Sequence, residues 1–183
     1  DQPPRLLIAV DPVEGTNLLA QWMTGAICVI AATLVGEGKL WGGIDGYMNK
    51  FIIGKSLADQ LAELRSSKPK NQLALQFDSS QFVLDQPIEA TVSLISYFTG
   101  KPTTSIVAEV LERPRNSDLI RRLRRMHVQV RLISDGDVTS AWRALSEDRE
   151  VDFYIGIGAA PEGVLSATMA NVAGGYMEGR CWF

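Results

Sequence analysis

The sequence has few of the residues that signal thiol, zinc or serine-hydrolase chemistry. Its two cysteines, Cys28 and Cys181, form no CxxC pair and no zinc-ligand spacing. Its one histidine, His127, has no accompanying GxSxG segment, which argues against a Ser-His-Asp triad. The longest strongly apolar run covers residues 26–35, whereas a membrane-spanning helix needs about 20 residues, and no secretory-signal pattern is visible. We therefore expect no membrane partner, and a reducing, cytoplasmic compartment fits the cysteine usage.

Charge is moderate overall but unevenly placed. The net charge of −3 argues against a general nucleic-acid binder. Residues 112–131 nevertheless contain seven arginines and only two acidic residues. This segment suggests that an anion is handled at one place, although a solvated helix face is the plainer interpretation.

The first 100 residues read mainly as strands. Apolar runs predict buried strands over 5–10 and 25–35, the first ending at Asp11-Pro12 and the second burying Cys28. Further along we expect a returning strand over 40–44, a strand over 47–53, a helix over 56–64 capped by Ser56, a polar loop over 66–71 and a weakly indicated helix over 87–98.

From Lys101 onward, short apolar runs alternate with helical segments. Strands are expected over 104–111, 128–133 and 151–155, the last followed by a glycine-rich turn, and helices over 116–126, 138–145 and 161–173. This alternation predicts a parallel sheet covered by helices, so the expected fold class is α/β. The change of pattern near Gly100 predicts a junction between a first, mainly antiparallel domain (1–100) and a second α/β domain (101–183).

The segment DPVEGTN, residues 11–17, carries the strongest chemical signal. Its two carboxylates lie three residues apart in a tight turn behind a strand, where Gly15 permits a positive φ. Oxygen ligands without a thiolate or imidazole suit Mg²⁺ or Mn²⁺, and the Thr16 hydroxyl could orient a metal-bound water. The alternative is a helix N-terminus, with Asp11 as the cap and Glu14 completing a capping box.

Two more carboxylate-bearing turns follow predicted strands. In residues 155–163 (IGIGAAPEG), Glu162 lies at a predicted helix N-terminus, where it would repel a bound phosphate unless a cation lies between the two. The alternative is that Glu162 only interacts favourably with the helix dipole. In residues 134–137 (SDGD), Asp135 and Asp137 could bind sugar hydroxyls or face a metal, or Asp137 could cap the next helix.

Three other side chains suit an anionic ligand. Arg113 and Arg115 lie at a strand-to-helix turn and could grip a phosphate through two hydrogen bonds each, or could be ordinary surface arginines. Tyr47 could place its hydroxyl on a ligand, although by itself it reads as a strand aromatic.

Together and in this order, the motifs resemble the class II fructose-1,6-bisphosphatases, some of which also act on sedoheptulose 1,7-bisphosphate. The matching segments are AVDPVEGTN (9–17), YMNK (47–50), RPR (113–115), RLISDGDV (131–138), GIGAAPEGV (156–164) and the glycine-containing stretch 174–180. The family belongs to the metal-dependent, lithium-sensitive sugar phosphatases. The resemblance implies their layered αβαβα architecture, present here in part.

The resemblance also implies residue roles. The activity would be hydrolysis of the 1-phosphate of fructose 1,6-bisphosphate in gluconeogenesis or Calvin-type metabolism, with Mn²⁺ or Mg²⁺ as cofactor. The implied metal ligands are Asp11, Glu14 and Glu162, and Thr16 would act with Asp11 and Glu14 in catalysis. The implied contacts to the sugar bisphosphate are Glu14, Gly15, Thr16, Tyr47, Arg113, Arg115, Asp135, Asp137 and Gly158.

The chain also departs from the family pattern. In the family, a segment ahead of the DPxEGT motif supplies two further acidic ligands, and the chain here opens with Asp1 rather than Met. We therefore expect a partial chain with little or no phosphatase activity alone, and a homo-oligomer at full length. The alternatives are a non-catalytic sugar-phosphate-binding protein and a related inositol-type monophosphatase, against which Glu14 and the SDGD and APEG segments argue.

Overall fold

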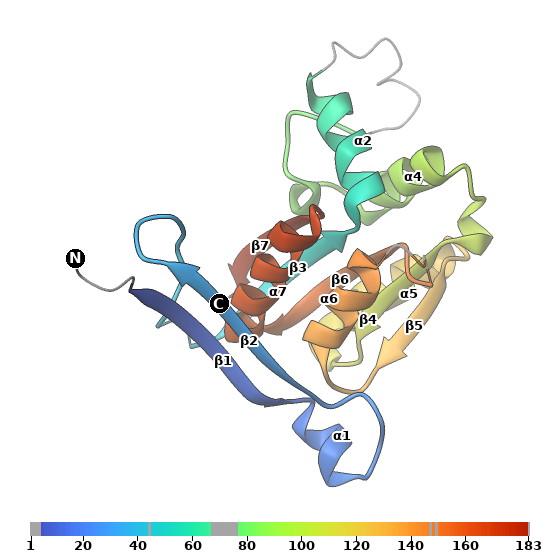
Figure 1. Cartoon of the computed structure of the whole chain (residues 1–183). Helices are drawn as coiled ribbons and strands as arrows, with labels where there is room; N and C mark the ends of the chain where they lie inside the picture. The colour runs from blue at the N-terminus through green and yellow to red at the C-terminus, as the bar shows by residue number, and fades with distance from the viewer. Residues whose placement is uncertain (1–4, 44, 67–76, 147, 149, 183) are drawn as a thin grey trace.

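The computed structural model describes residues 5–43, 45–66, 77–146, 148 and 150–182. These residues form a five-stranded sheet with helices on both faces and a separate two-stranded ribbon (Figure 1). Ile44 of the expected returning strand and residues 67–71 of the expected polar loop lie outside the described residues.

Most elements lie within a few residues of their predicted bounds. The strands are β1 (Leu6–Glu14), β2 (Ile27–Leu34), β3 (Tyr47–Ile53), β4 (Val107–Leu111), β5 (Gln129–Ile133), β6 (Phe153–Ala159) and β7 (Tyr176–Trp182). The α-helices are α1 (Thr16–Ala20), α2 (Lys55–Ser66), α4 (Ile88–Thr99), α5 (Ser117–Arg125), α6 (Asp137–Leu145) and α7 (Ala160–Ala173). Single 3₁₀ turns cover Val83–Asp85, Thr103–Ser105 and Pro114–Asn116.

The five-stranded sheet has the strand order β5-β4-β6-β3-β7. Strand β4 runs parallel to β5 and β6, which confirms the parallel arrangement predicted for the second half. Strand β3, from the first half of the chain, pairs antiparallel with both β6 and β7. The junction near Gly100 remains a proposal, and the segments on its two sides share this sheet.

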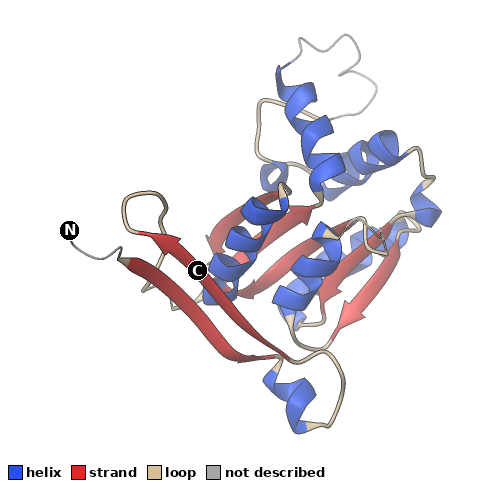
Figure 2. Cartoon of the chain, viewed as in Figure 1, coloured by secondary structure: helices blue, strands red, loops and turns tan. Residues whose placement is uncertain are grey.

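Different helices cover the two faces of the sheet (Figure 2). The larger core packs α2, α4 and α5 against one face, around side chains such as Phe51, Ile95 and Leu123. The other face packs α6 and α7 around Ile52 and Tyr154. The β1–β2 ribbon lies outside α7, where Ala31 meets Leu165 and Val138. The layers are therefore ribbon, helices, sheet and helices, an α/β architecture that matches four successive layers of the expected arrangement.

The strands predicted as buried over 5–10 and 25–35 form β1 and β2, but the prediction of burial is wrong. Ile8, Val10 and Ile30 are exposed by 60%, 52% and 68%. A nearly all-apolar run indicates two apolar faces, yet only one face of this ribbon packs on α6 and α7 in the described residues. Cys28, expected to be buried in the second run, is exposed for the same reason.

Strand β1 also continues past the point where we expected it to end. It runs through Pro12 to Glu14, with a register shift between Asp11 and Glu14. Proline is tolerated at such an irregularity, because no ladder hydrogen bond is required of it there.

The glycine-rich turn expected after Ile155 is likewise a strand, because β6 extends to Ala159. Its glycines admit close neighbours: a Cβ on Gly156 would lie 3.3 Å from the Asn116 amide, and one on Gly158 would collide with Asp137. These residues therefore serve close packing within the sheet.

Other local predictions had mixed outcomes. The strand over 47–53 and the helices near 88–99, 117–125 and 160–173 are confirmed. Residues 40–43 form no strand, Ser56 lies inside α2 rather than capping it, and β7 had no counterpart in the prediction. Among the described helices, none is long and apolar enough to cross a bilayer.

Candidate metal centre

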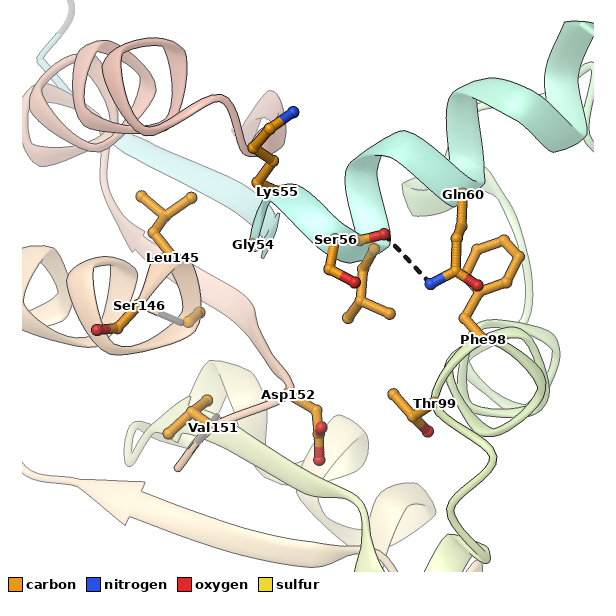
Figure 3. A pocket seen from close by; sticks show the side chains of 12 residues that line it. Gly54, Lys55, Ser56, Gln60, Phe98, Thr99, Leu145, Ser146, Val151 and Asp152 are labelled. Atoms are coloured by element: carbon orange, nitrogen blue, oxygen red, sulfur yellow. Dashed lines mark hydrogen bonds between the residues drawn. The ribbon is translucent and has the colours of Figure 1, made fainter. Parts of the chain in front are cut away.

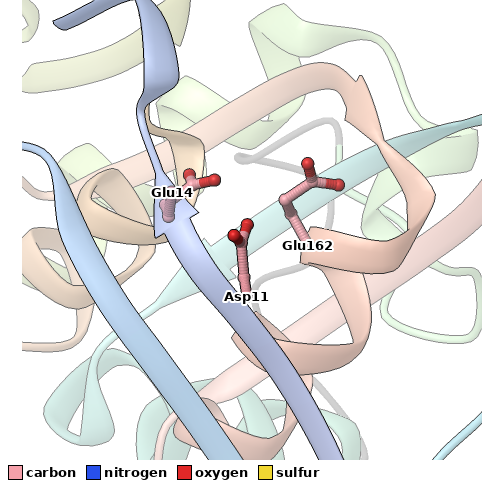
Figure 4. A group of neighbouring side chains, drawn as sticks. All are labelled: Asp11, Glu14 and Glu162. Atoms are coloured by element: carbon pink, nitrogen blue, oxygen red, sulfur yellow. The ribbon is translucent and has the colours of Figure 1, made fainter. Parts of the chain in front are cut away.

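Three carboxylates from distant parts of the chain converge beside the N-terminus of α7. Asp11 and Glu14 come from β1, and Glu162 comes from the first turn of α7 (Figure 4). Each offers one oxygen, and the three oxygens lie within 4.8 Å of one another. Asp11 and Glu162 are partly exposed, whereas Glu14 is 5% exposed.

The irregular end of β1 positions the first two carboxylates. Asp11 Oδ1 accepts a hydrogen bond from the Val13 amide at 3.0 Å, within the register shift. Glu14 Oε1 accepts one from the Val138 amide at 2.9 Å, in the first turn of α6. Gly15 follows with φ +82°, which glycine adopts without strain, and turns the chain into α1. The DPVEGTN segment therefore joins the ribbon to α6.

Two carboxyl groups of the cluster, those of Glu14 and Glu162, have raised pKa values. Burial raises the pKa of Glu14 from 4.5 to about 7, and the nearby Asp137, Glu162 and Asp11 carboxylates act in the same direction. Burial also raises the pKa of Glu162, with Asp137 adding to the effect and Lys50 opposing it. Without a counter-ion, the cluster therefore holds more negative charge than its surroundings favour.

The donor set fits a hard divalent cation. Among the described residues, the buried oxygens Glu162 Oε2 and Asp137 Oδ1 have no hydrogen-bond partner. Buried carboxylate oxygens normally have a partner, so these two need an explanation. Carboxylate oxygens are the ligands that Mg²⁺ and Mn²⁺ prefer, and a cation would also relieve the repulsion within the cluster.

A buried ion pair lies next to the cluster. Lys50 Nζ, on β3, lies 2.5 Å from Asp137 Oδ2, and the Tyr154 hydroxyl lies 3.4 Å from the same oxygen. Asp137 is only 6% exposed, so its carboxylate lies beneath the surface beside the cluster. Lys50 was not among the predicted site residues, and its burial arises only from the packing around β3.

Arg113, Arg115 and Tyr47, which were predicted to bind an anionic ligand, lie in two smaller groups of side chains. Arg113 pairs with Asp135 at 3.5 Å, and Asp135 also accepts a hydrogen bond from the Asn17 amide at 3.0 Å. The Arg115 guanidinium stacks 4.2 Å above the Tyr47 ring, which makes an edge contact with Trp182. Trp182 was not predicted as a site residue, because only the pairing of β7 with β3 places it opposite Tyr47.

The remaining predicted site residues are placed as follows. Thr16 is exposed at the first position of α1, directly after the buried Gly15. Gly158 is buried within β6, opposite Met48 of β3. The catalytic and substrate-binding roles of these and the other named residues stay predictions.

A separate cavity of about 250 Å³ lies under the N-terminus of α2 (Figure 3). Its lining includes Phe98, Leu145 and Asp152, and Gln60 bonds to the Ser56 carbonyl at its rim. Asp152 is already paired with Lys101 at 2.7 Å and with the Val107 amide. This cavity contains none of the predicted site residues.

Comparison with known proteins identifies the family. Over residues 1–183, the chain matches the family model described as "Bacterial fructose-1,6-bisphosphatase, glpX-encoded". Proteins named D-fructose 1,6-bisphosphatase class 2/sedoheptulose 1,7-bisphosphatase are 35% identical over 173 residues in Crocosphaera subtropica and 33% identical over 173 residues in Trichodesmium erythraeum. A protein of the same name from Synechocystis is 32% identical over 180 residues.

These matches cover 94–98% of this chain but 44–46% of the relatives, so the chain spans about half their length. The family model matches the chain from end to end. The chain belongs to the bacterial, glpX-encoded fructose-1,6-bisphosphatase family.

Proposed function

We propose that the chain is part of a metal-dependent sugar bisphosphatase that removes the 1-phosphate of fructose 1,6-bisphosphate. The relatives' names support sedoheptulose 1,7-bisphosphate as a second substrate. The observation that carries the metal dependence is the convergence of Asp11, Glu14 and Glu162, whose oxygens lie within 4.8 Å of one another.

In this proposal, Asp11, Glu14 and Glu162 would hold Mn²⁺ or Mg²⁺. When bound, such an ion supplies a water of lowered pKa and neutralises charge on the phosphate oxygens. Thr16, at the exposed start of α1, would orient the attacking water. Because the transition state of phosphoryl transfer spreads charge over the phosphate oxygens, positioning and electrostatic stabilisation do most of the catalytic work.

The other residues would hold the sugar bisphosphate. Arg113 and Arg115 would grip a phosphate, and Tyr47 and Asp135 would bind oxygens of the sugar phosphate. Asp137, ion-paired with Lys50, and the backbone near Gly15 and Gly158 would complete the site. We also propose that the full-length protein is a homo-oligomer and that it is cytoplasmic.

The test is phosphate release by the complete reading frame from both bisphosphates, with and without Mn²⁺ or Mg²⁺. Asp11→Asn and Glu162→Gln should each reduce the rate by at least about a hundredfold, because each removes a metal-binding charge from a site that works by electrostatic stabilisation. The matched control is Asp59→Asn, which should retain activity. Asp59 is an exposed carboxylate on α2, across the sheet from the cluster. Full activity in Asp11→Asn and Glu162→Gln would refute the site.

The same assay on the 183-residue chain tests the expectation that it releases little or no phosphate alone. Saturable binding of fructose 1,6-bisphosphate without turnover, in both this chain and the complete protein, would instead favour the non-catalytic alternative.

A further inference from the structure

A buried lysine, Lys50, lies beside the carboxylate cluster. Lys50 has 0% of its surface exposed, although β3 could have presented a small apolar residue there. Burying an ammonium is costly unless it is paired and hydrogen-bonded. The bonds that Lys50 makes therefore indicate what this side chain does.

Those bonds lead to the N-termini of α6 and α7, which lie beside the cluster. Lys50 Nζ lies 2.5 Å from Asp137 Oδ2, and Asp137 is the first residue of α6. The next residue, Val138, gives the amide that holds Glu14. Lys50 Nζ also donates to the Ala159 carbonyl at 2.9 Å, and Ala159 is the N-cap of α7, whose first turn carries Glu162.

The backbone leaves room for this arrangement. A Cβ on Gly158 would lie 1.9 Å from Asp137 Oδ2 and 3.0 Å from Lys50 Nζ, so any larger residue would displace the pair. A Cβ on Gly163 would lie 2.6 Å from Met48 Sδ but only in ordinary contact with Lys50 Cδ, at 3.6 Å. Gly158 of the GIGAAPEG segment therefore ties the shape of this segment to the ion pair.

We infer that Lys50 is a positioning residue of the metal centre, which fixes the N-termini of α6 and α7 so that Glu14 and Glu162 meet Asp11. Its ammonium also offsets the charge of Asp137, a carboxylate adjacent to three others. The inference rests on the proposed function, because it takes the cluster to be a metal site.

The experiment measures the Mn²⁺ affinity of the full-length protein encoded by the complete reading frame, from the loss of the free-ion EPR signal, together with the melting temperature without metal. Lys50→Met keeps an unbranched side chain that is shorter by one atom and removes the ammonium group with its charge. Lys101→Met is the matched control, since Lys101 pairs at 2.7 Å with another buried carboxylate, Asp152, away from the cluster. We expect Lys50→Met to weaken Mn²⁺ binding at least about tenfold, as loss of a residue that orients metal ligands does, and Lys101→Met to leave it unchanged.

Equal affinity of Lys50→Met and the unchanged chain would overturn the inference, and so would an equal loss in both variants, which would reflect general destabilisation. If Lys50→Met does not fold, Lys50→Met/Asp137→Asn, which removes both charges of the buried pair, is compared with Asp137→Asn alone. Equal affinity of these two variants would overturn the inference, and a further loss of about tenfold in the double variant would support it.

Asp11→Asn separates this result from failure of the proposed function. If the unchanged chain binds Mn²⁺ no better than Asp11→Asn, the metal centre itself fails and the inference falls with it. If Asp11→Asn loses affinity and Lys50→Met keeps it, the metal centre stands and only the role of Lys50 is refuted.

Discussion

The β1–β2 ribbon and the five-stranded sheet are built from similarly apolar strands but are packed very differently. Ile52 in β3 is 0% exposed and is covered by α6 and α7, whereas Ile8 in β1 is 60% exposed. Within the described residues, β3 has hydrogen-bonded neighbours on both sides, and β1 and β2 have only each other. A two-stranded ribbon is marginal by itself, so this one depends on its contact with the helices.

That contact is also where the carboxylates meet. Asp11 and Glu14 belong to the ribbon, and Glu162 belongs to a helix that packs on the sheet. The bond from the Val138 amide to Glu14 and the packing of Ala31 on Leu165 join the two regions. The cluster therefore forms only when the ribbon is seated, and changes that loosen the ribbon should affect the site before they affect the sheet.

The largest expected difference comes from the same substitution in the two regions. Ile52→Ala removes a fully buried side chain and should lower the free energy of unfolding by about 2–5 kcal/mol. Ile8→Ala, on the exposed face of the ribbon, should change it by less than about 0.5 kcal/mol. Urea unfolding measures both. A cost for Ile8→Ala as large as that for Ile52→Ala would show that the outer face of the ribbon is buried in solution.

This contrast marks how far the sequence predicts the fold. The strand over 47–53 and the helix over 161–173 were predicted closely, because alternation, caps and turns are local signals. The burial of the runs at 5–10 and 25–35 was predicted wrongly, because burial depends on what covers a strand. The local pattern of apolar residues does not show which elements will cover a strand.

The next effect concerns two glycines with similar backbone angles, Gly15 at the end of the ribbon and Gly100 after α4. Gly15 has φ +82° and a Cβ there would lie 3.2 Å from Leu18 Cδ1, whereas Gly100 has φ +67° and open space around it. Alanine at either position adds left-handed strain of about 1–2 kcal/mol, and Gly15→Ala should cost more because of the added contact. Urea unfolding again decides. A loss in Gly100→Ala with none in Gly15→Ala would show that the ribbon unfolds separately from the sheet.

At the candidate site, the sequence predicted which carboxylates would lie together better than it predicted the residues that pack beside them. Asp11, Glu14 and Glu162 were selected from motifs, and the fold brings their oxygens together. Lys50 and Trp182 were not selected, because their significance arises from strand pairing and burial across the sheet. A side chain that acts through another residue has no local signature in the sequence.

The last prediction concerns the pH dependence of stability in the metal-free chain, which arises where Glu14 of the ribbon meets α6. The pKa of Glu14 is raised from 4.5 to about 7, so between these values the folded chain binds more protons than the unfolded chain. The free energy of unfolding should therefore fall as the pH rises through this interval. Melting temperatures in the presence of a chelator should show this decline, and Glu14→Gln, which cannot ionise, should flatten it.

Adding Mn²⁺ should oppose the decline, because the ion binds the deprotonated carboxylate and its affinity rises as the pH increases toward and past 7. The melting temperature with Mn²⁺ should then diverge upward from the metal-free value as the pH rises, and less so in Glu14→Gln. Identical pH profiles for Glu14→Gln and the unchanged chain would mean that Glu14 is as well solvated when folded as when unfolded. The ribbon would then not pack against α6 in solution, and the proposed contact between the ribbon and the helices of the sheet would be wrong.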